Sequence, residues 1–519
     1  MNYLQKASLG VFLWGCAAMS DLSAQTNFIL HTDQSKVKIN KHIYGHFAEH
    51  LGRCIYGGIY VGENQTQIPH TEGVRNDMIE ALKALKVPNL RWPGGCFADT
   101  YQWKDGVGKK ENRPSLVNSW WGGVTEDNSF GTHDFLNLCE RIGAEPYLAG
   151  NVGSGSVKDL SDWVYYVNHP TGSPMAKWRQ ENGREKPWNV RMWGVGNEAW
   201  GCGGNMTAEY YTNIYRQYAT FMNDVNPDAK LMKIASGATG DDYHWTETLM
   251  KNIPHSLLHG VALHHYAVID WNKKGPSTAF TDYHYFRTLE EAWKMNELIT
   301  RHSTVMDKYD PQKKVALIVD EWGGWYDVEP GTNPGFLYQQ NTIRDALVAG
   351  MTLNIFNNHA ERVRGANLAQ IVNVLQAVIL TEGEKMLLTP TYHVMKMYQV
   401  HQDAQLIPLD FTSPIYSFEG KSIPAITASA SKDAAGILHI SLTNVDPTQT
   451  HALQFSLRGE NWKNIRAEIV TSPKVNEYNT FEEPNKITVQ PFKKVKLQDN
   501  KISTEIPPHS VMMLTINPS

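Results

Sequence analysis

The chain has little cysteine for its length, and its cysteines are not spaced as metal ligands. Only five occur among 519 residues, and no two follow the Cys-x-x-Cys spacing of structural zinc sites. So few cysteines also cannot build the disulfide framework that replaces a core in small secreted domains. We therefore expect no metal site, and a chain long enough to fold as two domains around hydrophobic cores.

An excess of positive charge and the common phosphate-binding loops are also lacking. The formal net charge is −5, with 48 Lys and Arg against 53 Asp and Glu. This balance gives no support for binding nucleic acid or an anionic membrane. Neither Gly-x-Gly-x-x-Gly nor Gly-x-x-x-x-Gly-Lys-Ser/Thr occurs, so no nucleotide cofactor is indicated.

The chain has no apolar run long enough for a membrane-spanning helix. The most apolar stretch, Ala7–Met19, follows Lys6 and is too short to cross a bilayer. Small residues then precede Gln25, which is typical of a secretory signal peptide over residues 1–24. This predicts export to the periplasm or the outside of the cell, with no membrane contact after the signal is removed. Cys16 weakly fits a lipoprotein cleavage box, so a lipid anchor is the alternative.

What the chain does have is a regular alternation of strand-like and helix-like segments between residues 43 and 395. Eight strand-then-helix units predict an α/β fold, a (β/α)8 TIM barrel with enlarged loops. The alternative is an open doubly wound sheet, but such a sheet would need a glycine-rich phosphate loop after an early strand. The eight predicted strands are Ile43–Leu51, Val87–Trp92, Ala144–Ala149, Val190–Val195, Leu231–Ala235, Val261–Tyr266, Val315–Val319 and Thr352–Phe356.

The pattern changes after about residue 396. Short alternating runs such as Ile437–Val445 and Val511–Ile516 are separated by polar turns, which is typical of an all-β sandwich. Residues 25–42 also alternate, and we expect them to add an N-terminal strand to this sandwich. The predicted division is therefore a signal peptide (1–24), an N-terminal strand (25–42), a barrel (43–395) and a C-terminal β-sandwich (396–519).

Two predicted strands end in very similar motifs that carry a carboxylate. Asn197 and Glu198 follow the fourth strand beside tryptophans and glycines, and Asp320 and Glu321 follow the seventh before Trp325. Barrel active sites lie at these strand ends, and paired carboxylates are the catalytic groups of glycoside hydrolysis. A gap of about 5 Å between them would indicate retention of configuration, and about 6.5–9.5 Å would indicate inversion.

The other strand ends carry polar and aromatic residues too. A single glutamate at a strand end is often only an ion-pair partner or a loop cap, but a full ring of such residues points to a site. The ring comprises Glu49, Arg91, Asn151, Asn197, Glu198, His264, His265, Tyr266, Glu321, Asn357, Asn358 and His359.

These motifs resemble the α-L-arabinofuranosidases of glycoside hydrolase family 51. The resemblance covers about 340 residues in the expected order and rests on several long motifs rather than one. They are IYGHFAEHLGRCIYGGIY (43–60), LRWPGGCFADTYQWKDGVG (90–108), WGVGNEAWGCGG (193–204), LHHY (263–266), DEWGGWY (320–326) and LAQIVNVLQAVI (368–379).

The resemblance implies a role for individual residues. Glu198 matches the general acid/base and Glu321 matches the nucleophile of a retaining mechanism, without metal or organic cofactor. The resemblance also implies that the protein assembles as a homo-oligomer, commonly a hexamer. Residues that match the arabinose-binding subsite are Glu49, Arg91, Cys96, Asn197, Tyr266, Trp325 and Gln370, with Trp271 in a loop that faces substrate in some members.

The residues and the resemblance together predict an exo-acting α-L-arabinofuranosidase that releases terminal arabinofuranose from plant polysaccharides or oligosaccharides. One alternative is a retaining endoglucanase or xylanase on the same barrel. The other is a non-catalytic carbohydrate-binding protein, although such a protein has no need of two opposed carboxylates. Because Cys96 follows Pro93-Gly94-Gly95 at the barrel mouth, we expect it in the pocket as a free thiol.

Overall fold

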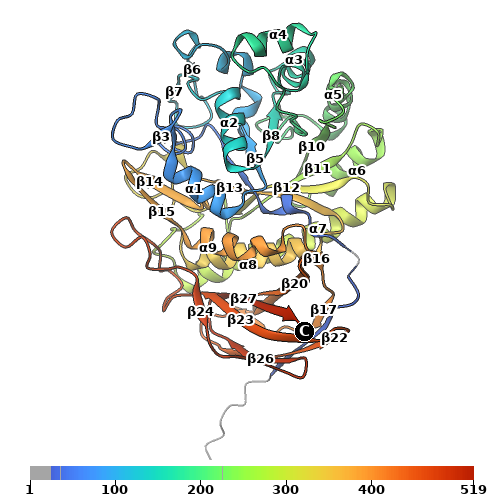
Figure 1. The fold of residues 1–519 in the computed structure, drawn as a ribbon, viewed down its shortest axis with the longest axis vertical. Helices are drawn as coiled ribbons and strands as arrows, with labels where there is room; N and C mark the ends of the chain where they lie inside the picture. The colour runs from blue at the N-terminus through green and yellow to red at the C-terminus, as the bar shows by residue number, and fades with distance from the viewer. Residues whose placement is uncertain (1–24, 36, 225) are drawn as a thin grey trace, which may run out of the picture.

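The computed structural model describes residues 25–519 except residues 36 and 225. The predicted signal peptide, residues 1–24, lies outside the described residues. The chain folds into a barrel surrounded by helices and a β-sandwich packed beneath it (Figure 1).

Eight parallel strands close into a barrel in which they follow one another in chain order. This confirms the predicted (β/α)8 barrel. Each strand hydrogen-bonds to its sequential neighbour, and the last pairs with the first. The strands are β2 (Gly45–Phe47), β5 (Asn89–Trp92), β8 (Glu145–Gly150), β9 (Met192–Val195), β10 (Met232–Thr239), β11 (Gly260–Ala267), β12 (Ala316–Gly324) and β13 (Val363–Ala369).

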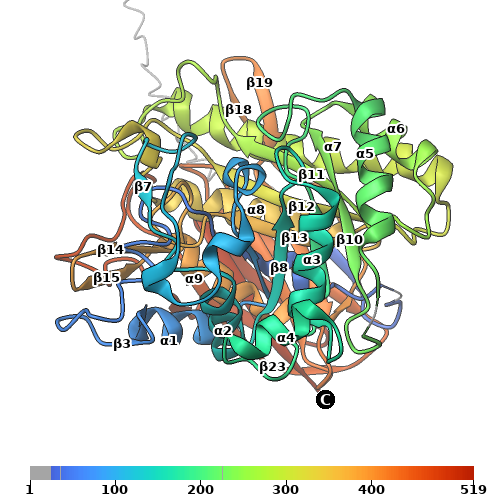
Figure 2. The ribbon, with the colours of Figure 1, turned by 90° about the horizontal axis from the view of Figure 1, so that it is seen from above.

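Helices cover the outside of the barrel, and a view from above shows them around the strands (Figure 2). They form where apolar residues recur at helical spacing. The helices are α1 (Asn76–Leu85), α2 (Thr132–Ile142), α3 (Val157–Asn168), α4 (Pro174–Glu181), α5 (Ala208–Phe221), α6 (Tyr243–Asn252), α7 (Asp282–Tyr309), α8 (Ile343–Asn358) and α9 (Pro390–Tyr398).

Helix α2 shows how the sequence sets the buried face and the end of a helix. Its buried residues Phe135, Leu138, Cys139 and Ile142 lie on one face because they follow the i, i+3, i+4, i+7 spacing. Gly143 ends the helix at φ +75°, where its N–H caps the last carbonyls. Glycine suits this position because it adopts the left-handed conformation without a side-chain clash.

The inside of the barrel is filled below the strand ends. A small apolar cluster draws one or two side chains from each of five consecutive strands, β8 to β12. Packing of this kind is typical of a barrel whose interior is a solid core rather than a pore. The cluster consists of Tyr147, Met192, Ile234, Ala262, Ala316 and Ile318.

The predicted eighth strand is wrong. Thr352–Phe356 lies inside helix α8, and the strand that closes the barrel is β13. Every residue of α8 from Ile343 to Asn357 is buried, because the helix lies between the barrel and the sandwich. A helix that is buried on all sides has no polar face, so its sequence has no helical period and resembles a buried strand.

The sandwich consists of two sheets of five and six strands. β1 (Thr26–His31) lies in the first sheet, parallel to β22 and antiparallel to β17. The first sheet has the order β17 (Leu409–Phe411), β1, β22 (His451–Arg458), β26 (Lys501–Ile506) and β25 (Val495–Gln498). The second has the order β16 (Gln405–Leu406), β20 (Ile426–Lys432), β21 (Leu438–Asn444), β27 (Ser510–Pro518), β23 (Trp462–Val470) and β24 (Gln490–Phe492).

Over the described ranges, 25–35, 37–224 and 226–519, the connections contain four two-stranded hairpins and six short 3-10 helices. The hairpins are β3 (His70–Thr71) with β4 (Val74–Arg75), β6 (Leu116–Val117) with β7 (Thr125–Glu126), β14 (Ile379–Glu382) with β15 (Lys385–Leu388), and β18 (Ile415–Phe418) with β19 (Lys421–Pro424). The 3-10 helices are η1 (Lys41–Tyr44), η2 (Cys96–Asp99), η3 (Trp103–Gly106), η4 (Lys110–Asn112), η5 (Pro334–Phe336) and η6 (Gln399–His401). Among the described residues, no helix combines the length and the apolar character required to span a membrane.

A buried polar network joins the barrel to the sandwich. Asn354 of α8 accepts hydrogen bonds from Ser429 (3.0 Å) and Ser441 (2.7 Å) through Oδ1. Its Nδ2 donates to Thr427 (3.2 Å) and Thr443 (3.4 Å). All four partners lie on strands β20 and β21, so one amide connects helix α8 to the sheet beneath it.

The expectation of a free thiol at Cys96 is also wrong. Cys96 of η2 forms a disulfide with Cys202, in the loop that follows β9, with the two Cα atoms 5.4 Å apart. The two residues are 106 positions apart in the chain, and only the closed barrel brings their loops together. Cys54 and Cys139 are buried and free.

We expect mapping of the cysteines to distinguish these two kinds of site. When the protein is denatured without reductant and alkylated, peptides with Cys54 and Cys139 should carry the label, and those with Cys96 and Cys202 should not. Reduction before alkylation should label all four. Labelled Cys96 in the unreduced sample would contradict the disulfide.

Replacing Asn354 should weaken the junction between barrel and sandwich. The Asn354→Ala variant removes four buried hydrogen bonds between helix α8 and the sheet, which should lower the free energy of unfolding by about 1–3 kcal/mol. The midpoint of urea unfolding would measure this. Asn358→Ala is the matched control, because its amide is exposed and makes a single bond to Ala428 O. Equal losses in both variants would contradict the role of the buried network.

Candidate active site

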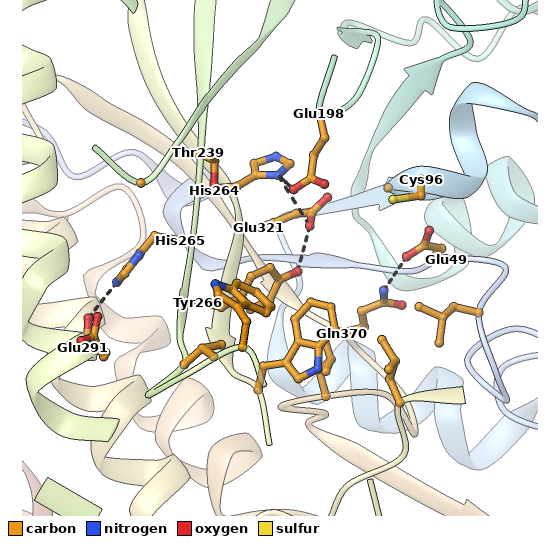
Figure 3. Close-up of a pocket in the computed structure, with 18 of the residues that line it drawn as sticks. Glu49, Cys96, Glu198, Thr239, His264, His265, Tyr266, Glu291, Glu321 and Gln370 are labelled. Carbon is orange, nitrogen blue, oxygen red and sulfur yellow. Dashed lines mark hydrogen bonds and ion pairs between the residues drawn. The ribbon is translucent and has the colours of Figure 1, made fainter. Parts of the chain in front are cut away.

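The strand ends of the barrel surround a cavity of about 510 Å³ (Figure 3). Most of the residues proposed from the sequence lie in its wall, although they come from six different connections or strands. These are Glu49, Cys96, Glu198, Tyr266, Glu321, Trp325 and Gln370. Arg91 and Asn197 are not in the wall. They lie behind it, where both are almost completely buried.

Glu198 lies in a tight loop rather than on a strand. Strand β9 ends at Val195, and Gly196 turns the chain at φ +85°. Glu198 itself has φ +40°, a region that non-glycine residues seldom adopt and that costs of order 1–3 kcal/mol. The loop closes on the carbonyl of Glu198, which accepts from the N–H groups of Gly201 (2.7 Å) and Gly203 (3.1 Å).

Glu321 is held by a strand and by two side chains. It lies in β12 and is almost fully buried. Arg91 Nη1 donates to Glu321 Oε1 at 2.9 Å, and Tyr266 Oη donates to Oε2 at 2.8 Å. Both donors stabilise the ionised carboxylate, and together they fix the direction in which it faces the cavity.

Arg91 also fixes the neighbour of Glu198. Its Nη2 donates to Asn197 Oδ1 at 2.6 Å, so one guanidinium bridges the Glu198 loop and strand β12. This orientation of the amide leaves Asn197 Nδ2 directed toward Cys202 Sγ, 3.9 Å away.

His264 lies between two carboxyl groups. Its Nδ1 is 2.8 Å from Glu198 Oε1, and its Nε2 is 3.0 Å from Asp320 Oδ1. Burial opposes a charge on the ring, but Glu321, Asp320 and Glu198 together raise the pKa of His264 to about 10. Asp320 is fixed in turn by Tyr147, whose hydroxyl donates to Oδ2 at 2.7 Å. A proton can therefore be shared between Glu198 and His264.

Burial raises the pKa of Glu198, the hydrogen bond with His264 opposes this, and the charge of Glu321 raises it further. Glu198 therefore holds its proton to higher pH than an ordinary glutamate. The two carboxylates are close together: one oxygen of each, with a ring nitrogen of His264, lies within 4.8 Å of the others. A closest approach of this order fits the gap of ~5 Å of retaining glycosidases.

A third carboxyl group lies at the inner end of the cavity. Glu49 Oε2 accepts from Gln370 Nε2 (2.8 Å), and Oε1 accepts from Trp121 Nε1 (2.9 Å) and the N–H of Phe97 (3.2 Å). Burial and the charge of Glu321 raise the pKa of Glu49 to about 7. Glu49 and Gln370 are almost inaccessible to solvent, so this end of the cavity is blind.

Aromatic rings form the opposite side and lead to the surface. Tyr266 and Trp325 pack edge to face, with ring centroids 5.1 Å apart, and Trp325 packs in the same way on Trp271 at 5.3 Å. Trp271 is 58% exposed. The row of rings therefore runs from Glu321, which Tyr266 contacts, to the rim, where it offers apolar faces to sugar rings.

Within the described part of the chain, two groups of side chains are close enough to hold a metal ion, but in both groups these side chains already bond to one another. Cys96 and Cys202 lie near Glu198, and their sulfurs are bonded to each other. Glu198, His264 and Glu321 form the second group, in which the ring nitrogens of His264 contact carboxylates. The second group has the geometry of a hydrogen-bonded acid–base pair.

Several residues of the site were missed from the sequence. His264 was in the predicted ring of strand-end residues, but its contact with Glu198 was not predicted, and Asp320 stood beside the chosen Glu321. Trp121 comes from a long connection, and nothing in the sequence pointed to it. Asp99 lies in the motif at 90–108, but nothing in that motif indicated its contact with another loop. Asp99 accepts a hydrogen bond from the backbone N–H of Asn197 in the Glu198 loop, a contact that depends wholly on how the loops fold.

Comparison with known proteins gives consistent matches along the chain. Residues 81–300 match the family model of the α-L-arabinofuranosidase 1 domain, and residues 320–510 match that of the α-L-arabinofuranosidase C-terminal domain. An intracellular exo-α-L-arabinofuranosidase from Bacteroides ovatus is 49% identical over 98% of this chain and 100% of its own length.

Solved structures agree with these matches. The GH51 arabinofuranosidase from Xanthomonas axonopodis pv. citri has a TM-score of 0.93 and 47% identity, covering 95% of this chain and 100% of its own. The α-L-arabinofuranosidase from Thermotoga maritima, solved as an arabinose complex, has a TM-score of 0.84 and 30% identity, with coverage of 95% and 100%.

The relatives overturn the prediction of export to the periplasm or the outside of the cell. The relative from Bacteroides ovatus, which this chain matches from end to end, is intracellular. The prediction rested on the short apolar run after Lys6 and on small residues before Gln25. Such a composition is permitted in a signal peptide but does not by itself direct export.

The matches extend over the barrel and the sandwich and include relatives well above 30% identity along nearly the whole chain. They agree with the motifs around Glu198 and Glu321 from which the same family was predicted. The chain belongs to the α-L-arabinofuranosidases of glycoside hydrolase family 51.

Proposed function

We propose that this protein is an exo-acting, retaining α-L-arabinofuranosidase that uses Glu321 as nucleophile and Glu198 as general acid/base. The observation that carries the proposal is the pair of carboxylates at the cavity wall, one oxygen of each lying within 4.8 Å of the other. The inner end of the cavity supports exo action, because Glu49 and Gln370 are almost inaccessible to solvent there and a continuing chain would need an opening. The relative from Bacteroides ovatus is likewise named an exo-enzyme.

In the first step, Glu321 attacks the anomeric carbon of the bound arabinofuranosyl unit. Glu198 gives its proton to the glycosidic oxygen, and the alcohol leaves. The bond between carbon and the leaving oxygen breaks as the bond to Glu321 forms. Arg91 and Tyr266 hold Glu321 in line for this attack.

In the second step, Glu198 removes a proton from water, which attacks the same carbon and releases Glu321. The change of role follows from charge. While Glu321 is ionised, its charge helps to raise the pKa of Glu198. Once Glu321 is esterified that charge is gone, so the pKa of Glu198 falls and it becomes a base. Two displacements at one carbon leave its configuration unchanged.

The remaining residues would bind the sugar or hold the groups that do. Glu49 and Gln370 form a polar pair at the blind end, suited to sugar hydroxyls. Trp325 and Tyr266 supply the aromatic wall. Cys96 would offer a disulfide surface, and Asn197, fixed by Arg91, lies beside the reacting carboxylates.

The substrate class we propose is arabinose-containing plant polysaccharide or oligosaccharide. The exposed face of Trp271 at the rim supports a partner sugar outside the blind end. We also propose that the protein forms a homo-oligomer, a hexamer as the family resemblance implies. Light scattering coupled to size-exclusion chromatography should then give six times the chain mass, and a monomer mass would contradict the hexamer.

Replacing the two glutamates should have different consequences. In Glu321→Ala no glycosyl-enzyme can form, so hydrolysis of every substrate should be lost. In Glu198→Ala the first step should survive on an aryl arabinofuranoside with a good leaving group, because such a phenol scarcely needs a proton. The second step then stalls, so we expect a burst of phenol, and azide should restore turnover as arabinosyl azide. Polysaccharide hydrolysis should fall by about 10²–10⁴-fold.

The pH profile and a control variant make this test sharper. Glu198 must be protonated for the first step, so wild-type activity on polysaccharide should fall as the pH rises past the raised pKa of Glu198. This fall in activity at high pH should be absent from Glu198→Ala when the substrate is an aryl arabinofuranoside with a good leaving group. Glu209→Ala, an exposed glutamate on α5, is the matched control and should retain wild-type activity. A burst and azide product from Glu321→Ala instead would reverse the two roles.

A further inference from the structure

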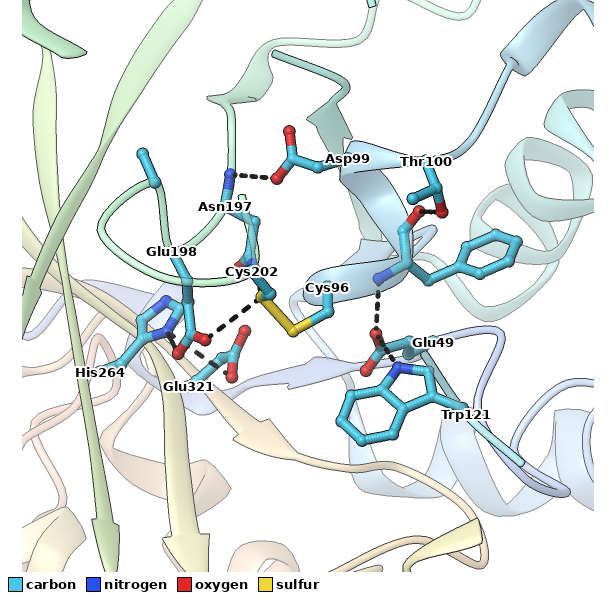
Figure 4. The surroundings of a disulfide bond; sticks show 12 residues. Glu49, Cys96, Asp99, Thr100, Trp121, Asn197, Glu198, Cys202, His264 and Glu321 are labelled. Atoms are coloured by element: carbon cyan, nitrogen blue, oxygen red, sulfur yellow. Dashed lines mark hydrogen bonds and ion pairs between the residues drawn. A yellow bond between two sulfur atoms is a disulfide. The ribbon is translucent and has the colours of Figure 1, made fainter. Parts of the chain in front are cut away.

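Asp99 lies outside the cavity but directly behind the Glu198 loop (Figure 4). It ends the 3-10 helix η2 and is only 3% exposed. Its carboxylate accepts three backbone hydrogen bonds from two other loops. Oδ1 accepts from the N–H groups of Val152 and Gly153, both at 2.8 Å, and Oδ2 accepts from the N–H of Asn197 at 3.1 Å.

No ion pair to Asp99 is found within the part of the chain that the structure describes. A carboxylate buried without a cation is costly unless hydrogen bonds replace the lost water. Here three N–H groups offset part of this cost, although burial still raises the pKa of Asp99 to about 7. They also bring the loops after β5, β8 and β9 to one point. We call this point, made by Asp99, Val152, Gly153 and Asn197, the three-loop joint.

The three-loop joint is closely packed. A Cβ on Gly203 would lie 1.8 Å from Asn197 O and 2.8 Å from Asp99 Oδ2. A Cβ on Gly153 would lie 2.8 Å from Gly203 O and 3.0 Å from Asp99 Cβ. Only glycine fits at these two positions, so the loops have little freedom to move relative to Asp99.

Glu198, the residue next to the three-loop joint, has a strained backbone conformation. Asn197 directly precedes Glu198, whose φ of +40° must be maintained by its surroundings. Asp99 holds the chain before Glu198 through the Asn197 N–H. The disulfide holds the chain after it, since Cys202 is bonded to Cys96 of the same 3-10 helix. Both ends of the turn are therefore fastened to η2.

We propose that Asp99 is a positioning residue for the general acid/base: by holding the Asn197 N–H it keeps the Glu198 carboxyl aimed at the glycosidic oxygen. The inference rests on the function proposed for Glu198. Asp99 touches neither substrate nor the reacting atoms, and it acts only through the loop.

Because Glu321 lies on a different element from Glu198, positioning of Glu198 by Asp99 can be distinguished from a general structural role of Asp99. Glu321 lies on strand β12 and is held by Arg91 and Tyr266. It has no bond to Asp99 and is linked to the Asp99 contact only through the bond from Arg91 to the side chain of Asn197. A disturbed Glu198 loop should impair proton donation while attack by Glu321 continues. The expected signature is a dependence of the defect on how much the leaving group needs a proton.

The test variant is Asp99→Asn, which keeps the size of the side chain but replaces one carboxylate oxygen with NH₂. An amide that still accepts from Val152 and Gly153 turns its NH₂ toward the Asn197 N–H, and two donors cannot bond. On aryl arabinofuranosides with phenols of high pKa, kcat/KM should fall about 10–100-fold, since a shift of ~1 Å at a catalytic group costs that order. On phenols of low pKa it should stay within about threefold of wild type.

Asp127→Asn is the matched control, because Asp127 is exposed and its Oδ1 accepts a single backbone bond, from Ser129. It should behave as wild type on both kinds of phenol. Glu198→Ala provides the reference pattern for loss of the acid. If Asp99→Asn does not fold, as judged by circular dichroism and thermal melting, Asp99→Ser takes its place with the same expectation.

The results separate the two proposals. An equal fall of kcat/KM on both phenols, or no fall on either, overturns the positioning role of Asp99 while Glu198→Ala still shows the leaving-group dependence. If Glu198→Ala itself lacks that dependence, the function proposed for Glu198 fails. A selective loss in Asp99→Asn, with the nucleophilic step intact, supports the inference.

Discussion

The buried guanidinium of Arg91 is the interaction on which the site depends. It donates to Glu321 and to Asn197 and lies 3.6 Å from Asp320. Four carboxyl groups, those of Glu49, Glu198, Asp320 and Glu321, gather around this cation and His264. Without a fixed positive charge so many carboxylates could not be buried together, because each would be forced to take a proton. Burial would raise the pKa of Asp320, but the charge of Arg91 and the contacts with His264 and Tyr147 lower it, while Glu198, which does not contact Arg91, keeps a raised pKa.

The two proposed catalytic groups are held in different ways. Glu321 lies within a barrel strand, where the ladder of hydrogen bonds and the apolar cluster beneath it leave little freedom. Glu198 lies in a loop with an unfavourable backbone φ angle, and its position depends on bonds to groups outside the loop. These are the Asp99 carboxylate, the Cys96–Cys202 disulfide and the ring of His264. The difference suits the proposed chemistry, since the nucleophile must stay in line for attack and the acid/base must serve both a leaving group and water.

The sandwich also helps to support the strand that carries Glu321. Helix α8 packs against β20, β21 and β27 on one side and β12 on the other. Its complete burial explains why its sequence resembled a strand, and the Asn354 network keeps it in register with the sheet below. The strand that carries Glu321 is thus supported from behind by a helix that is itself clamped between two domains.

The sequence by itself determined the barrel and the sandwich, the carboxylates at the ends of the fourth and seventh strands, and the family. Hydrophobic periodicity and local motifs are properties of neighbouring residues, so they can be read before folding. Contacts between distant segments cannot be inferred in this way, because they depend on the folded chain. The pairing of Cys96 with Cys202, the place of His264 between Glu198 and Asp320, and the three bonds of Asp99 join residues from separate loops. Strand β13 was likewise missed, because part of helix α8 was taken for the eighth strand. Burial of that helix removes the period by which a helix is recognised. Only the closed barrel, which brings all eight strand ends to one rim, decided these contacts.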